Sequence, residues 1–344
     1  MKLQRLMLAV LAVCGTSAAM AQSSVTIYGR VNTSIEHQKL GNAKVTGMFD
    51  NASRIGFKGV EDLGGGLKAG FQLEAGFNAD NGSGASGKGM SFNRQSEVNL
   101  SGNWGMLRLG NFTAESYFAT ADYVSWINHD TGTSADALYY DPVMFGALGQ
   151  SNKISYRTPE MGGFWAEAAM QLHENNPTYT TQGGNGQNKN GYDLAANYAA
   201  GNLGLGAGYS QVGKNKQAAL RVNYAFGPVM LGAYYQRNDE KTLNLGTRNN
   251  FRLSAMYTFG ASELILSAGH ASKWSNVADS SATQWTLGYN YNLSKRTKVF
   301  AYYNHVKNKS AANYAYGYFG GASANVPQYG AKSSSIALGV RHNF

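Results

Sequence analysis

The stretch Ser335-Ile-Ala-Leu-Gly-Val-Arg-His-Asn-Phe344 alternates between two kinds of side chain. Ile336, Leu338, Val340 and Phe344 fall at every second position or a multiple of it, while alanine, glycine, arginine and asparagine stand between them. A period of two predicts a β-strand with one apolar face and one small or polar face. A strand of this kind at the end of an exported chain favours a transmembrane β-barrel.

The first 21 residues have the pattern of a signal peptide. Lys2 and Arg5 form a positive start, residues 6–13 are apolar but too short to span a bilayer, and Ala19-Met20-Ala21 fits the cleavage pattern. We therefore expect residues 1–21 to be removed and residues 22–344 to form one barrel domain. Lipoprotein processing at Cys14 is the alternative, disfavoured because the bulky Val13 precedes the cysteine.

Cys14 is the only cysteine, so a chain that begins at Gln22 has no thiol for disulfides or thiolate metal sites. The six histidines show no H-x-x-x-H spacing, which argues against a zinc site. Residues 82–88 approach a phosphate-binding loop, but Gly89 replaces the required serine or threonine. We expect no cofactor and no metal.

The net charge is +9, and removal of Lys2 and Arg5 leaves 9 − 2 = +7. Nucleic acid is excluded as a partner because the protein is exported and has no basic run. No stretch after residue 21 has eighteen consecutive apolar residues, so a membrane-spanning form must be a closed barrel. The 43 glycines, 22 tyrosines and five prolines suit strands and turns better than helices.

Sixteen segments have strand character, and many approach the ~9–11 residues that a tilted transmembrane strand needs. An even number returns both ends of the barrel to the same side. The spans are 25–38, 53–60, 67–78, 92–101, 105–112, 152–158, 163–174, 191–200, 203–212, 216–226, 229–240, 249–259, 263–274, 282–293, 297–308 and 334–344.

The connections alternate between short and long, which is typical of barrels with periplasmic turns and external loops. The long ones are 39–52, 79–91, 113–151, 175–190, 241–248, 275–281 and 309–333, and the link near Lys214 is a brief external loop. Face assignment supports this interpretation. In 282–293, Trp285, Leu287 and Tyr289 oppose a polar set that contains Gln284 and Asn290. The polar set must face a wet interior if the apolar set faces lipid.

Several motifs resemble the general diffusion porins of Gram-negative outer membranes, in a beta-proteobacterial branch. They are Val25-Thr-Ile-Tyr-Gly29, Ser53-Arg-Ile-Gly-Phe-Lys-Gly59 with Glu61-Asp-Leu-Gly64, Leu67-Lys-Ala-Gly-Phe-Gln-Leu-Glu74, Asn93-Arg-Gln-Ser96 and Pro159-Glu-Met-Gly-Gly-Phe164. The likeness runs the length of residues 22–344. Two positions depart from the family pattern. Met161 stands in place of the usual phenylalanine, and Glu97 stands in place of an aromatic residue.

The resemblance implies a sixteen-stranded antiparallel transmembrane barrel, a homotrimer and a third external loop that folds inward to form the narrowest point. It also implies contacts with outer-membrane lipid and lipopolysaccharide, and with the barrel-assembly machinery through Phe344. If Arg94 faces the interior, Glu97 three residues later faces outward, toward a subunit contact.

The candidate pore constriction combines the long loop 113–151 with basic residues on the wall. The loop contains five acids and no lysine or arginine: Glu115, Asp122, Asp130, Asp136 and Asp141, of which the first three are expected in the lumen. Alternation turns Arg54, Lys58, Arg94, Lys153 and Arg157 inward, and also Arg30, Arg108, Arg221, Arg252 and Arg341. By resemblance, Arg54, Arg94 and Arg157 match the family's arginine cluster.

These features predict an outer-membrane general diffusion porin that passes small hydrophilic solutes and ions without catalysis and mildly prefers anions. Opposed charges across a narrow aqueous pore create a focused field. A substrate-specific channel is the main alternative and needs an interior aromatic or basic ladder. An outer-membrane enzyme needs a Ser-His-Asp/Asn constellation, and an adhesin needs a plugged interior. For any single arginine, the alternative to a role in ion selectivity is that it is a solvated residue that only keeps the pore interior hydrated.

Overall fold

The computed structural model describes residues 24–85, 89–122, 124, 136–140, 151–173, 189–315 and 329–344. The predicted signal peptide lies outside these residues. The described part is almost entirely antiparallel sheet, with α2 (Glu115–Tyr117) and η1 (Phe118–Asp122), a short π-helical segment, between strands. The strands are β1 (Ser24–Leu40), β2 (Ala43–Asp50), β3 (Arg54–Gly64), β4 (Leu67–Gly76), β5 (Gln95–Gly102), β6 (Gly105–Asn111), β7 (Lys153–Arg157), β8 (Phe164–Gln171), β9 (Gly191–Ala200), β10 (Leu203–Val212), β11 (Asn215–Phe226), β12 (Val229–Glu240), β13 (Gly246–Phe259), β14 (Ser262–Ala271), β15 (Ala282–Asn292), β16 (Thr297–Asn308) and β17 (Lys332–Asn343).

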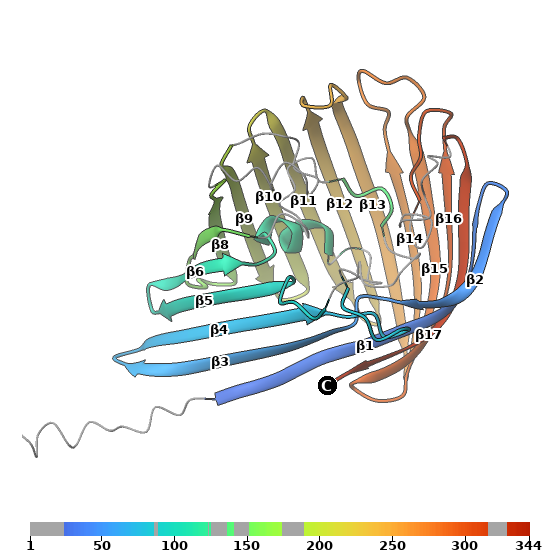
Figure 1. Cartoon of the computed structure of the whole chain (residues 1–344). Helices are drawn as coiled ribbons and strands as arrows, with labels where there is room; N and C mark the ends of the chain where they lie inside the picture. The colour runs from blue at the N-terminus through green and yellow to red at the C-terminus, as the bar shows by residue number, and fades with distance from the viewer. Residues whose placement is uncertain are drawn as a thin grey trace, which may run out of the picture.

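The sheet closes into a barrel because β1 pairs with the C-terminal strand β17 on one edge and with both β2 and β3 on the other. β2 and β3 form one strand of the barrel, interrupted at residues 51–53, where Ala52 has a φ of 57°. The 17 ladder segments therefore make a closed antiparallel barrel of sixteen strands, as predicted. Figure 1 shows these strands as one continuous wall.

The prediction of a long loop over residues 39–52 is wrong. β1 continues to Leu40 and β2 begins at Ala43, so Gly41 and Asn42 form a tight turn, and Gly41 has a φ of 56°. Glycine adopts this left-handed conformation without steric cost. Residues 43–50 extend the wall by pairing with β1. The predicted turns at 201–202 and 227–228 are confirmed, and the brief link near Lys214 is the turn Gly213-Lys214. The turn predicted at Gly102-Asn103 lies one residue later, at Asn103-Trp104, because β5 continues to Gly102.

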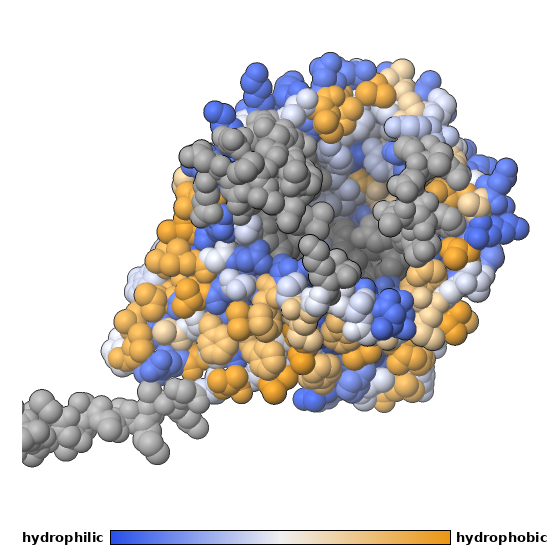
Figure 2. Space-filling model, in the orientation of Figure 1, coloured by the Kyte–Doolittle hydropathy of each residue, from blue (hydrophilic) through white to orange (hydrophobic). Residues whose placement is uncertain are grey.

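The two faces of the wall differ as the alternation predicts. In β15, Gln284 and Asn290 are buried on the inner face, whereas Trp285 is 42% and Leu287 45% exposed on the outer face. β13 shows the same pattern, with buried Arg252 between exposed neighbours. Figure 2 shows hydrophobic residues gathered on the outside of the barrel. An apolar exterior and a polar interior are what a membrane-spanning barrel requires.

Apolar clusters also occur on the inner side, and they involve the long segment between β6 and β7. Tyr117, Ala121 and Val124 pack with Tyr234 of β12, and Leu138 packs with Ala271 of β14. The interior is thus polar overall with local apolar contacts beneath this segment. Within the described residues, no helix has the length and hydrophobicity to cross a membrane.

Candidate functional site

The first described part of segment 113–151 is fastened to β9 and β10. Ser116 donates a backbone hydrogen bond to Asp193 Oδ1 at 3.2 Å, and its hydroxyl donates to Asp193 Oδ2. Ser210 on β10 also donates to Asp193 Oδ2, at 2.6 Å. Asp193 belongs to the inner face of β9 and is 1% exposed. The beginning of the segment therefore lies against the inner wall, where Figure 1 draws α2 and η1.

Glycines on β10 make this contact possible. A Cβ atom built on Gly206 would lie 1.8 Å from the Ala119 carbonyl oxygen, and one on Gly208 would lie 2.8 Å from the Ser116 Cβ. Neither distance is compatible with a real side chain. Gly204, Gly206 and Gly208 recur at every second residue of one face, and glycine inside a strand can mark the close approach of another backbone. This glycine spacing is readable in the sequence, although none of the three was among the predicted site residues.

A chain of ion pairs, buried except at the half-buried Arg157, joins the segment to β5–β8. Glu97 binds Arg108 at 2.6 Å, and Arg108 binds Glu167 at 3.1 Å. Glu167 also binds Arg157 at 2.7 Å, and Arg157 in turn binds Glu115 of α2 at 2.8 Å. Three carboxylates thus share two guanidinium groups. Burial raises the pKa of Glu115 to about 7, Arg157 opposes that rise and Glu167 adds to it.

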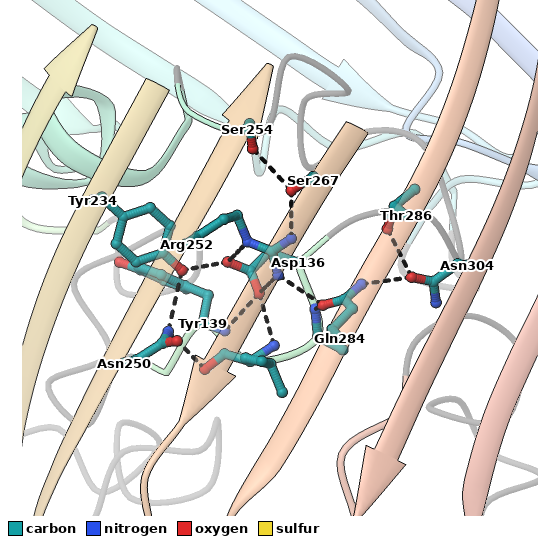
Figure 3. A network of polar contacts seen from close by, with 12 residues as sticks. Asp136, Tyr139, Tyr234, Asn250, Arg252, Ser254, Ser267, Gln284, Thr286 and Asn304 are labelled. Carbon is teal, nitrogen blue, oxygen red and sulfur yellow. Dashed lines mark hydrogen bonds and ion pairs between the residues drawn. The ribbon is translucent and has the colours of Figure 1, made fainter. Parts of the chain in front are cut away.

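A second anchor holds residues 136–140 against β12–β15. Asp136 accepts two hydrogen bonds from Arg252, Nε to Oδ2 at 2.9 Å and Nη2 to Oδ1 at 2.5 Å, and it also accepts one from Tyr234. Arg252 further donates to Ser267 and Gln284 at 2.8 Å each. The Arg252 and Asp136 side chains are 1% and 0% exposed. Figure 3 shows Asp136 inside this ring of partners.

The backbone around Asp136 reinforces the anchor. Asp136 Oδ1 accepts the N–H of Leu138 at 2.8 Å, and the Leu138 carbonyl accepts from Arg248 at 2.6 Å and from Asn250 at 3.0 Å. Gln284 accepts the N–H of Ala137 at 2.9 Å. A bidentate arginine–carboxylate pair with its other hydrogen bonds satisfied is a strong and directional contact. The two anchors therefore attach the segment to β9–β10 and to β12–β15.

Arg54 and Arg94 lie together on the N-terminal side of the wall, and Lys58 lies further along β3. Arg54 is directly opposite Gly76 of β4 in the register, and a Cβ on Gly76 would meet Arg94 Cδ at 3.3 Å. Gly76 therefore leaves room for Arg94 beside Arg54. The Lys58 Nζ atom lies 5.5 Å from the centre of the Tyr28 ring.

The expectation that Glu97 faces outward is wrong. β5 begins at Gln95, so Arg94 lies before the strand and reaches Glu74 at 2.6 Å without sharing the strand's alternation. Glu97 is 9% exposed and binds Arg108 on the inner face. The assumption that Arg94 and Glu97 belonged to one regular strand produced the error.

The remaining predicted residues within the described part of the chain contact segment 113–151 or belong to it. Lys153 is 2% exposed, and its Nζ donates to the Phe112 carbonyl, so it holds the base of the segment. Asp122 accepts a hydrogen bond of 3.4 Å from the Tyr117 hydroxyl. Arg157 touches the segment directly at Glu115. Asp130 and Asp141 lie outside the described residues.

A basic column follows the inner wall where the barrel closes. Arg54 on β3 is opposite Arg30 on β1, Arg30 is opposite Asn343 on β17, and Arg341 on β17 is opposite Lys298 on β16. Arg30 Nε also donates to Asn343 Oδ1 at 3.0 Å. This basic column, defined as Arg54, Arg30, Arg341 and Lys298, spans four adjacent strands. Lys298 was not among the residues predicted to face inward, although its alternation with Val299 is readable.

Carboxylates of the described wall also lie near the basic column. Glu263 of β14 accepts hydrogen bonds from Asn290 at 2.7 Å and from Asn292 at 2.9 Å. Glu74 of β4 is a further acid on this side of the wall, and it pairs with Arg94 at 2.6 Å. Among the described residues, no group of histidine, aspartate and glutamate side chains could hold a metal ion.

Comparison with known proteins agrees with this architecture. A family model described as Gram-negative porin matches residues 8–312. Outer membrane porin protein 32 of Delftia acidovorans is 33% identical over the whole of both chains, and an outer membrane porin of Bordetella pertussis is 28% identical, covering 95% of this chain and 96% of its own. The solved structure of an anion-selective porin from Comamonas acidovorans is 27% identical with a TM-score of 0.73, over 94% of this chain and 100% of that one. A closed sixteen-stranded barrel with a polar inner face, matched along most of its length by these relatives, shows that the chain belongs to the family of Gram-negative outer-membrane porins.

Proposed function

We propose that this porin is a general diffusion pore for small hydrophilic solutes and ions, with a modest preference for anions and no catalytic activity. The basic column at the barrel closure carries the anion preference. Charges on the wall of a narrow aqueous pore act through confined water beside low-dielectric protein, so their field is focused. The similar porin from Comamonas acidovorans is itself described as anion-selective, which supports the same sign here.

Some basic residues of the wall form ion pairs. Arg157 pairs with Glu115 and Glu167, and Arg94 pairs with Glu74. We assign the anion preference to the basic column because its cations lie on four adjacent strands of the inner wall.

The constriction is proposed to form from segment 113–151. Its described parts contact inner-face residues on two stretches of wall, Asp193 on β9 and Arg252 on β13, and the Tyr117 and Tyr139 rings of the segment lie 5.6 Å apart. Contacts of this segment with buried inner-face side chains support its position inside the barrel. The acids Glu115, Asp122 and Asp130 and the residues Arg54, Lys58, Arg94, Lys153 and Arg157 are proposed to border or support the narrowest part.

Replacing Arg54 and Arg30 together by glutamine should lower the anion-to-cation permeability ratio about two- to fivefold. A unit charge 4–8 Å from a permeating ion contributes about 0.5–1 kcal/mol in a water-like dielectric, and screening at 0.15 M salt reduces the sum for two charges by roughly half. The measurement is the reversal potential across a salt gradient in planar bilayers. The effect should shrink as salt rises, because the Debye length is only about 8 Å at 0.15 M. Lys307→Gln is the matched control, since Lys307 is exposed on the outer face of β16.

An unchanged reversal potential in the double variant would refute the assignment of selectivity to the basic column. Conductance that saturates with one solute, in place of a linear dependence on salt, would favour the substrate-specific alternative over a general diffusion pore.

The protein is further proposed to act as a homotrimer that contacts lipopolysaccharide and is inserted by the barrel-assembly machinery through Phe344. A trimer is described for the structurally similar OmpT of Vibrio cholerae. Phe344 extends the ladder of β17, because its N–H donates to the Gly29 carbonyl at 3.1 Å and its carbonyl accepts from Gly29 at 3.0 Å.

Deleting Phe344 should strongly reduce the yield of assembled protein in the outer membrane. The deletion removes two backbone hydrogen bonds at the barrel closure, each worth about 1 kcal/mol, together with the terminal aromatic ring. The measurement is the amount of heat-modifiable oligomer in isolated outer membranes. Refolding the same variant in detergent is the control, and equal loss in both assays would place the defect in barrel stability and not in recognition by the machinery.

A further inference from the structure

Arg248, near the external end of β13, is a buried cation that is held largely by aromatic rings. Its side chain is 1% exposed. Its guanidinium carbon lies 5.2 Å from the centre of the Tyr140 ring, 5.1 Å from that of Trp274 and 5.2 Å from that of Tyr314. Arg248 Nη2 donates to the Leu138 carbonyl at 2.6 Å, and Nη1 donates to the Tyr314 hydroxyl. Within the described residues, Arg248 forms no ion pair with a carboxylate.

The three rings come from segments that are far apart in the sequence. Tyr140 belongs to segment 113–151, Trp274 to the external loop after β14, and Tyr314 to the external connection after β16. The Tyr140 and Trp274 rings also contact each other edge to face, with 5.0 Å between their centroids. Arg248 therefore joins segment 113–151 to two external segments at one point.

Backbone hydrogen bonds fix the loop after β14, residues 272–281, to β13 and to the connection after β16. The Ser275 N–H donates to the Thr247 carbonyl at 2.9 Å. The Ala311 N–H of the connection donates to the Asp279 carbonyl of the loop, also at 2.9 Å. The two external segments are therefore linked to each other and to the strand that carries the buried cation.

A small apolar cluster supports the same junction. Leu138 packs with Ala271, Ala282 and Ala312, and Tyr314 packs against this cluster. The leucine comes from the segment of the proposed constriction, and Ala312 and Tyr314 come from the connection after β16. Both the segment and the connection therefore supply contacts that exclude water from the junction.

The way in which Arg248 is held makes the junction cooperative. Burying a cation without a counter-charge is costly unless other groups compensate it. Among the described residues, the Nε atom of Arg248 is buried without a hydrogen-bond acceptor. Cation–π contacts are strongest where water is excluded, so withdrawal of one ring weakens the contacts with the other two. Arg252 differs, because Asp136 compensates its charge directly.

We propose that the Arg248 latch, defined as Arg248 with Tyr140, Trp274 and Tyr314, couples the external surface to the pore. A protein ligand seated on the loop after β14 displaces Trp274, admits water to the guanidinium and loosens its hold on segment 113–151. The docking equilibrium of that segment is the element that both the ligand and the latch bias. The inference rests on the proposed constriction by this segment.

The test attaches a bulky protein to the loop from outside. After removal of the signal peptide the chain has no cysteine, so Ala278→Cys, at an exposed position of the loop, supplies a single thiol for a biotin reagent. Streptavidin added to the external side of a planar bilayer should raise the time spent at altered conductance levels about fivefold, which corresponds to about 1 kcal/mol. With Arg248→Met in the same chain, streptavidin should have no further effect, because the latch is already open.

Lys214→Cys is the matched control, because Lys214 is exposed at the external turn between β10 and β11, away from the latch. Each variant is compared with itself before streptavidin is added, so the lost lysine charge cancels. Streptavidin at this turn should leave the conductance levels unchanged. An equal response at both positions would mean obstruction of the pore mouth and would overturn the proposal. No response at Ala278→Cys would overturn it as well, as would an undiminished response with Arg248→Met.

Trp274→Leu is the second variant, which keeps the proposal testable if Arg248→Met does not assemble. It removes one ring in an external loop and leaves the strands of the wall unaltered. It should abolish the response to streptavidin in the same way, and a retained response would refute the latch. Asp136→Asn separates the two proposals. If this variant changes the conductance but streptavidin does not, the latch is wrong and the constriction stands, whereas no change in either experiment refutes both.

Discussion

Asp136→Asn should detach residues 136–140 from the wall and raise single-channel conductance and current noise. The substitution leaves the Arg252 guanidinium 1% exposed without its counter-charge. Removing one partner of a buried ion pair costs about 3–5 kcal/mol, because the other charge stays buried and uncompensated. Asp136 lies between strands, so the barrel ladder itself keeps its hydrogen bonds. We expect the loss to appear as movement of the segment and not as unfolding of the barrel.

The measurement is conductance in planar bilayers, with heat-modifiable mobility as the check on the barrel. The double variant Asp136→Leu with Arg252→Met removes both charges and should recover part of the lost docking free energy, since well-packed apolar pairs often replace buried ion pairs at little cost. Lys241→Ala is the control. It breaks the exposed pair Lys241–Asp239, with N–O at 3.1 Å, which is worth about 1 kcal/mol or less. Wild-type conductance and noise in Asp136→Asn would show that this contact does not position the segment.

Alternation within strands made the barrel predictable. Each strand has to present apolar side chains to lipid and polar ones to the interior, so the pattern is repeated along the whole chain. The failures occur where alternation is locally broken. Residues 39–52 were predicted as a long loop, although 43–50 continue the ladder. Arg94 and Glu97 were placed on one strand although β5 begins between them.

Contacts across the interior were less predictable. Arg252 was correctly turned inward, yet nothing in its own strand indicates that Asp136, more than a hundred residues earlier, is its partner. Asp136 was identified as a loop acid but was not among the three acids expected in the lumen. The basic column was not predicted either, because its residues are far apart in the sequence. Arg54 and Arg30 neighbour Arg341 and Lys298 only because the barrel closes between β1 and β17.

Gly206→Ala should displace the start of the segment from β10. The new Cβ would lie 1.8 Å from the Ala119 carbonyl oxygen, and a backbone atom cannot yield in the way that a flexible side chain can. Overpacking of this kind typically costs about 1–3 kcal/mol, which shifts a docking equilibrium roughly 5- to 150-fold. The strand itself accepts alanine, because Gly206 is not among the described glycines with positive φ. The expected result is a wider pore with higher conductance in a barrel of normal stability.

Gly204→Ala provides the matched control on the same strand and the same face. A Cβ there would lie 3.8 Å from the nearest atom, Asn223 Cβ, which is an ordinary contact. This variant should keep wild-type conductance and should be neutral or slightly stabilising, because alanine reduces the entropy of the unfolded chain. Both substitutions add one methyl group to the same face of β10, two residues apart. They differ in how closely the new methyl group approaches α2 and η1. Equal conductance in both variants would mean that the pore does not depend on how closely this segment approaches β10, and the proposed constriction would then need another boundary.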